Sequence, residues 1–170
     1  MPEKLFCDFC GTEISNDAEF CTKCGTIFID DVSCFNHSDN DANGVCAICH
    51  QPYCKRCGLR VNNIFFCNEH SHYEIYEGMA RVFGSSDEQQ VNFYKTILEE
   101  NKLHPFIYER KTSPLSLGGV DYSLFRASGE FNGHIINEIK LMVPCAEVLQ
   151  AENIIGEVDQ STDKNTNSDE

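Results

Sequence analysis

The chain has 170 residues, a formal net charge of -14 from 13 basic and 27 acidic side chains, and eleven cysteines. Such an acidic chain lacks the basic stripe that neutralises phosphates, so its composition disfavours DNA- and RNA-binding proteins. No apolar run approaches the roughly 18 residues that span a bilayer, which disfavours a membrane protein.

The start of the chain argues against export. Its first eight residues hold no apolar segment of signal-peptide length and carry charge at Glu3 and Lys4. Cysteines that are not exported stay reduced, the form in which they bind metal. We therefore expect a cytoplasmic protein whose cysteines are metal ligands rather than disulfide partners.

Ten cysteines and two histidines fall into six pairs that each enclose two residues. Structural Zn²⁺ takes four Cys or His ligands, and a two-residue spacer lets one tight turn direct both ligands at one ion. Twelve ligands suffice for three structural zinc ions and leave no open position for catalysis. The predicted ligands are Cys7, Cys10, Cys21, Cys24, Cys34, His37, Cys46, Cys49, Cys54, Cys57, Cys67 and His70.

Residues 6–12 (FCDFCGT) and 20–26 (FCTKCGT) form an internal repeat. In each copy a glycine follows the second cysteine, where a turn with positive φ costs glycine little. A tight turn that carries two ligands in this way is called a zinc knuckle. Two knuckles on facing hairpins can share one ion. This stretch resembles the short zinc-ribbon module at the start of many prokaryotic proteins, which implies one Cys₄ site. We assign residues 1–30 to this ribbon.

The other four pairs lie in residues 34–70 and allow a sequential or an interleaved grouping. Only four residues separate the second and third pairs, so these knuckles lie back to back and more naturally face different ions. We therefore favour interleaving. The interleaved sites are Cys34, His37, Cys54 and Cys57 for one ion, and Cys46, Cys49, Cys67 and His70 for the other.

This pattern also resembles the B-box zinc finger, a RING relative with interleaved ligands, and we assign it residues 31–73. The family often ends in His-x₂-His where this chain has Cys67-x₂-His70, so His72 is an alternative to His70 as the last ligand. Large aliphatic residues are few in residues 1–73. Structural zinc supplies about 10–16 kcal/mol of apparent binding energy per site, which in such small modules is largely folding energy.

From Gly78 onward, periodic apolar residues replace the metal-ligand pairs. Ser86 and Gln89 form a capping box that opens a helix ending near Asn101, and Pro144 begins a helix that ends near Ile155. The order of elements predicts a small α+β sandwich over residues 78–156. Its strands are expected at residues 79–83, 104–109, 121–127 and 138–143. The polar, acidic residues 157–170 are expected to form a disordered tail.

Three segments carry a resemblance to a small family of prokaryotic signal-transducing domains: Ala80–Phe83 followed by Ser-Ser-Asp, Ile97–Leu103, and Lys140–Pro144. The resemblance implies a ferredoxin-like or PII-like fold and a signalling role. Residues 110–135 are an insertion that departs from the family. Cys145, outside the six pairs, is expected to be a buried, inert thiol rather than a reactive one.

Together these features predict a non-enzymatic zinc-binding adaptor or signalling module. It would contact a protein partner, with a homodimer through the α+β domain as a further expectation. One alternative is a small-ligand sensor, because PII-like folds bind effectors between subunits. A ubiquitin ligase would need a recruiting surface that the sequence does not establish. Nucleic-acid binding has only one small basic cluster to draw on, Lys55, Arg56 and Arg60.

Overall fold

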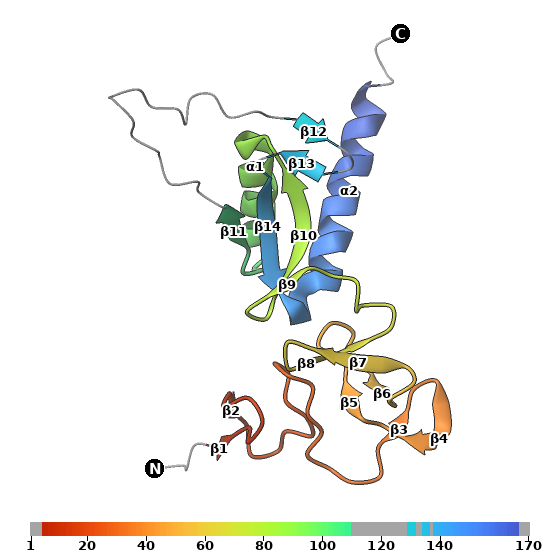
Figure 1. Ribbon diagram of the computed structural model, residues 1–170. Coiled ribbons are helices and arrows are strands. Elements are labelled where there is room, and N and C mark those ends of the chain that lie inside the picture. Colours follow the sequence, from red (N-terminus) through yellow and green to blue (C-terminus); the bar gives the residue numbers. More distant parts are fainter. Residues whose placement is uncertain (1–4, 110–128, 132–133, 137, 167–170) are drawn as a thin grey trace. The chain divides into compact units, whose positions relative to one another are not determined.

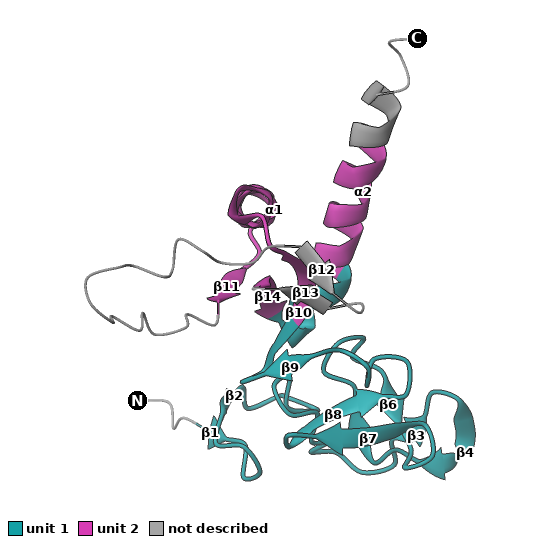
Figure 2. Ribbon diagram, turned by 45° about the horizontal axis from the view of Figure 1, so that its top comes forward, with its two compact units in different colours: residues 1–80, 144–149 teal, residues 81–143, 150–170 magenta. Residues whose placement is uncertain are grey.

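The computed structural model describes residues 5–109, 129–131, 134–136 and 138–166 (Figure 1). The chain divides into two compact units (Figure 2). The first comprises Met1–Ala80 and Pro144–Leu149, and the second Arg81–Val143 and Gln150–Glu170. The finer predicted division into residues 1–30, 31–73 and 78–156 stays a prediction. Within the described residues, no helix combines the length and apolar character needed to cross a bilayer.

The first unit is built from short antiparallel strand pairs. In the ribbon, β1 (Leu5–Phe6) pairs with β2 (Glu13–Ile14), and Phe20 bridges Ile27. The remaining pairs are β3 (Ser33–Cys34) with β4 (His37–Asp41), β5 (Gly44–Val45) with β6 (Pro52–Tyr53), and β7 (Gly58–Val61) with β8 (Ile64–Cys67). Strands of two to five residues bury little apolar surface, so a small unit of this kind needs another source of stability.

The β7–β8 hairpin supplies the main apolar core of the first unit. Phe65 and Phe66 are both fully buried. A Cβ on Gly44 or Gly58 would lie 2.6 Å from the Phe65 ring, so both glycines make room for this side chain. The hairpin turns through two residues with positive φ, Asn62 and Asn63, and asparagine tolerates this conformation better than most residues.

The second unit contains most of a four-stranded sheet in the order β11-β14-β10-β9. The chain crosses from the first unit within β10 (Met79–Ser85). The other strands are β9 (Ile75–Tyr76), β11 (Phe106–Glu109) and β14 (Ile139–Pro144). Three of these four agree with predicted strands, whereas β9 was not predicted. The predicted strand at residues 121–127 lies outside the described residues, and β12 (Gly129–Phe131) pairs with β13 (His134–Ile136) as a separate hairpin.

Helix α1 (Glu88–Glu100) packs through Val91, Tyr94 and Leu98, whose spacing places them on one face. The prediction of Ser86 as N-cap was wrong. Asp87 is the N-cap, and its carboxylate accepts a hydrogen bond from the Gln89 N–H at 2.9 Å. Aspartate and serine cap helices about equally well, so the sequence pattern left the register open by one residue.

The last helix begins later and ends later than predicted. Pro144 closes β14, a 3₁₀ helix covers Cys145–Glu147, and α2 runs from Val148 to Thr166. Residues 157–166 are therefore helical, and their assignment to a disordered tail was wrong. The Tyr94 hydroxyl donates a hydrogen bond to the Asp159 carboxylate. This contact with α1 holds α2 beyond Ile155, which the polar composition did not reveal.

Candidate zinc sites

The structure gathers the twelve predicted ligands into three groups of four. Within each group the ligand atoms all lie within 4.8 Å of one another. The groups are Cys7, Cys10, Cys21 and Cys24 (the first tetrad), Cys34, His37, Cys54 and Cys57 (the second tetrad), and Cys46, Cys49, Cys67 and His70 (the third tetrad). This is the interleaved grouping, and the sequential alternative is excluded.

The sulfur spacing of the first tetrad fits a tetrahedral ion. The Sγ atoms of Cys7 and Cys24 are 3.7 Å apart, and those of Cys10 and Cys21 are 3.6 Å apart. Zn–S bonds of about 2.3 Å at tetrahedral angles place sulfurs about 3.8 Å apart. The observed edges agree with that value and greatly exceed a disulfide bond, and all eleven cysteines are free.

The two mixed tetrads have matching geometry around their histidines. The Nδ1 atom of His37 lies 3.8 Å from the Cys34 Sγ and 3.2 Å from the Cys57 Sγ. The Nδ1 atom of His70 lies 3.5 Å from the Cys46 Sγ and 3.2 Å from the Cys67 Sγ. A zinc ion with sulfur and nitrogen ligands requires about 3.6 Å. The three tetrads thus fit three structural zinc ions.

The structure distinguishes His70 from its alternative, His72. The His72 ring stacks on Tyr73 with their centroids 4.5 Å apart, and His72 is outside the third tetrad. The backbone N–H of His70 donates to the Cys67 carbonyl at 3.1 Å, closing the turn that brings its imidazole to the other ligands. His70 is therefore the ligand that the geometry selects.

Backbone hydrogen bonds shape the ribbon knuckles identically. In the first knuckle, Cys7 N donates to Thr12 O at 2.8 Å and Gly11 N donates to Cys7 O at 2.7 Å. In the second, Cys21 N and Gly25 N make the equivalent bonds, each at 2.8 Å. Gly11 and Gly25 have φ of 70° and 72°, the left-handed conformation that the repeat predicted.

The predicted knuckle at Cys46 and Cys49 repeats this turn with a histidine in place of the glycine. Cys46 N donates to Gln51 O and His50 N donates to Cys46 O, both at 2.9 Å. His50 has a φ of 55° and occupies the place of the knuckle glycine. It is therefore a turn residue rather than a ligand. Aligning residues 46–51 with the two ribbon repeats would have revealed it, but the histidine concealed a position usually filled by glycine.

Hydrogen bonds favour the ionised form of one thiol in each tetrad. Burial raises the pKa of Cys10, but hydrogen bonds with Thr12 outweigh it and lower this pKa to about 6. At Cys34 burial again raises the pKa, but hydrogen bonds with the Cys54 backbone and with His37 outweigh it and lower this pKa to about 6. The hydrogen bond with Cys49 lowers the pKa of Cys46. Thiolates are the metal-binding form of cysteine, so these hydrogen bonds favour the ionisation state that zinc requires.

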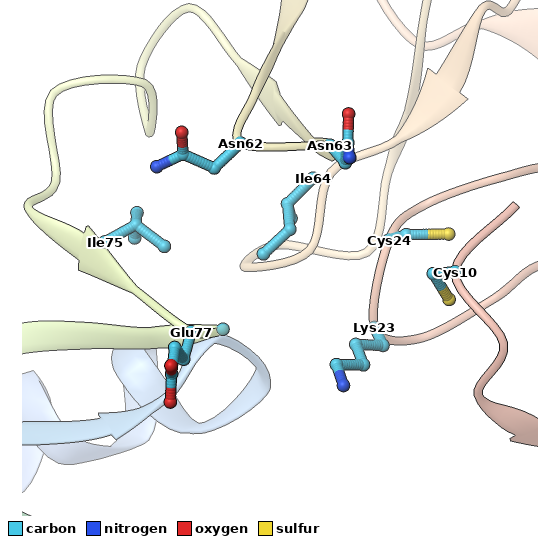
Figure 3. A pocket seen from close by; sticks show the side chains of 9 residues that line it. Cys10, Lys23, Cys24, Asn62, Asn63, Ile64, Ile75 and Glu77 are labelled. Carbon is cyan, nitrogen blue, oxygen red and sulfur yellow. The ribbon is translucent and has the colours of Figure 1, made fainter.

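A hollow of about 420 Å³ lies beside the first tetrad (Figure 3). In this view Cys10 and Cys24 lie on the right of the hollow, Ile75 and Glu77 lie across from them, and the turn at Asn62–Asn63 lies above. Its lining residues are Cys10, Lys23, Cys24, Asn62, Asn63, Ile64, Ile75, Glu77 and Gly78. Cys10, the second ligand of the first ribbon knuckle, therefore borders this hollow.

Comparison with known proteins supports the ribbon. Residues 6–28 match the family model of the zinc-ribbon domain. No curated protein and no solved structure gives a significant match to the chain. Zinc-binding modules in the first unit, followed by a sheet-rich region, are thus what the geometry and the comparisons establish. The B-box and signal-transducing resemblances stay predictions.

Proposed function

We propose that this chain is a non-enzymatic, cytoplasmic adaptor in which zinc supports a surface for a protein partner. The main observation behind this proposal is that the ribbon exposes large apolar side chains while it buries three of its four predicted zinc ligands. Leu5, Phe6 and Phe9 are 44%, 55% and 49% exposed, and Phe28 and Ile29 are also exposed. Cys7, Cys21 and Cys24 are buried. Exposed aromatic side chains of this kind are typical anchors of protein interfaces.

Charge narrows the class of partner. The ribbon and the chain as a whole are acidic, and complementary potentials favour association. We therefore propose a partner with an apolar surface bordered by Lys and Arg. The small basic cluster of Lys55, Arg56 and Arg60 offers little to a nucleic acid, because Arg60 is bound within the first unit. This favours a protein partner. The Arg60 guanidinium donates to the Cys24 carbonyl at 3.1 Å and lies 4.5 Å from the Phe9 ring centroid.

The second unit would supply the signalling role within this proposal. The order β11-β14-β10 supports a ferredoxin-like or PII-like relationship, since a ferredoxin-like sheet also places its third strand between the first two. Here β9 occupies the remaining edge, next to β10. β11 ends the described sheet on the other side and carries the exposed Phe106, which favours this edge for the expected homodimer.

Partner capture with the full-length chain tests the proposal. Phe6→Ala combined with Ile29→Ala removes exposed apolar area without touching a ligand, so zinc content should stay at three per chain while partner recovery falls at least tenfold. Phe93→Ala is the matched control, because Phe93 is 53% exposed but lies on α1. Equal recovery by the double variant and the wild type, with or without chelator, would instead assign recognition to the second unit.

A further inference from the structure

The second ribbon knuckle is hydrogen-bonded to β5 and β8, the strands that lead to the third-tetrad ligands Cys46 and Cys67. Val45 N donates to Gly25 O at 2.9 Å, and Phe65 N donates to Cys24 O at 3.1 Å. Val45 precedes the ligand Cys46, and Phe65 lies in β8, which ends at the ligand Cys67. The second ribbon knuckle, which carries two ligands of the first tetrad, is thus joined by backbone hydrogen bonds to segments next to Cys46 and Cys67, two ligands of the third tetrad.

Arg60 reinforces this junction from β7. Its guanidinium donates to Cys24 O at 3.1 Å and to Thr26 Oγ1 at 3.3 Å. The same group lies 4.5 Å from the Phe9 ring centroid and 5.8 Å from that of Phe65. The Arg60 guanidinium therefore bridges the ribbon and the buried core of the β7–β8 hairpin.

The two knuckle glycines show that only the second knuckle docks through its backbone. A Cβ on Gly25 would lie 2.0 Å from the Val45 carbonyl oxygen, a separation that backbone atoms cannot accept. A Cβ on Gly11 would meet nothing within 4 Å. Their φ angles differ by only 2°, since they are 72° and 70°. The two glycines thus share a backbone conformation and differ in what surrounds them. Substituting each by alanine therefore gives a test variant and its matched control.

We propose that the first and third tetrads are linked zinc sites, each strengthening zinc binding at the other through the docked Cys24–Gly25 knuckle. Zinc at the first tetrad fixes the knuckle in the conformation that bonds to Val45 and Phe65. Loss of that zinc frees the knuckle and weakens the strands that hold Cys46 and Cys67. Linkage is reciprocal, so third-tetrad occupancy must favour the ribbon equally. The inference rests on zinc binding and not on the adaptor role.

Removing ribbon ligands in the full-length chain tests the link. Cys7→Ser with Cys10→Ser eliminates ligands from the first knuckle and leaves the residues of the backbone junction, Cys24, Gly25, Val45 and Phe65, unchanged. Under competition with a zinc chelator, the third tetrad should lose affinity on the order of tenfold. Imidazole NMR signals separate the sites, because His37 belongs to the second tetrad and His70 to the third. An unchanged third-tetrad affinity would overturn the proposal.

Comparing Gly25→Ala with Gly11→Ala tests whether the coupling between the two tetrads passes through the docked knuckle. With zinc buffered so that the ribbon stays loaded, Gly25→Ala should weaken the third tetrad, whereas Gly11→Ala should leave its affinity within about twofold. In the Cys7→Ser/Cys10→Ser background Gly25→Ala should add little, because the link is already lost. Equal effects of the two glycine substitutions, or a fully additive effect of Gly25→Ala in that background, would refute coupling through the docked knuckle.

Discussion

Replacing His50 with glycine tests whether this residue is a turn position rather than a metal ligand. His50 is exposed, has a φ of 55° and occupies the place held by Gly11 and Gly25 in the ribbon knuckles. Its ring contacts Phe20 only loosely, with centroids 6.0 Å apart. The substitution should therefore relieve backbone strain at little cost in side-chain contacts.

The expected gain comes from opposing backbone effects. The left-handed conformation costs an L-residue about 1–2 kcal/mol, and glycine avoids this cost. Glycine in turn loses about 0.5–1 kcal/mol more than other residues through the entropy of the unfolded chain. His50→Gly should therefore stabilise the first unit by about 0.5–1 kcal/mol. All three zinc ions should remain.

Chemical unfolding at a fixed free zinc concentration measures this effect, because bound zinc contributes to the apparent stability by mass action. Zinc content should be determined on the same samples. His50→Ala serves as the control, since it removes the imidazole but keeps the strained φ, and it should not stabilise the chain. A zinc content of two in His50→Gly, or destabilisation by more than about 1 kcal/mol, would refute the assignment of His50 as a turn residue.

Three further outcomes are expected. Lys102 has a φ of 63° after α1, where Leu103 N bonds to Leu98 O. Lys102→Gly should stabilise the second unit to chemical unfolding by about 0.5–1 kcal/mol. Burial raises the pKa of Cys145 to about 12, so native zinc-loaded protein should resist alkylation there at pH 8, and labelling of Cys145 in mass spectra before unfolding would contradict this. Burial and the Asp159 hydrogen bond raise the pKa of Tyr94 to about 12. Neutral tyrosine is thus favoured by folding, and its stabilisation should be lost as pH rises from 10 to 12 in the wild type but not in Tyr94→Phe, as followed by circular dichroism.

The zinc ligands could be predicted because their information is local. A two-residue spacer is a property of one turn, and the four residues between Cys49 and Cys54 already favoured different ions for adjacent knuckles. Strands β10 and β14 and helix α1 were also predictable, since their apolar residues recur with a regular period. The prediction of the zinc modules therefore depended on chemistry that short segments contain by themselves.

Tertiary backbone contacts were not predictable in this way. Gly11 and Gly25 stand in nearly identical sequence repeats, yet only Gly25 packs against Val45. Backbone hydrogen bonds leave no side-chain pattern that would distinguish the two. The end of α2 was missed for a different reason. Its polar segment contacts α1 through a side-chain hydrogen bond between Tyr94 and Asp159, which are 65 positions apart in the chain, so no local pattern reveals it.

Phe9 connects the proposed partner surface with the proposed link between zinc sites. Phe9 is 49% exposed, and the face of its ring lies under the Arg60 guanidinium that also binds the Cys24 carbonyl. A partner that covered Phe9 would exclude water from this cation and strengthen its electrostatic interaction with the carbonyl. Partner binding would then hold the docked knuckle more firmly and favour zinc at both linked tetrads. Conversely, loss of ribbon zinc would release Cys24 and disturb the aromatic surface that the partner contacts. Zinc occupancy and partner binding would thus depend on each other through two side chains, Phe9 in the ribbon and Arg60 in β7.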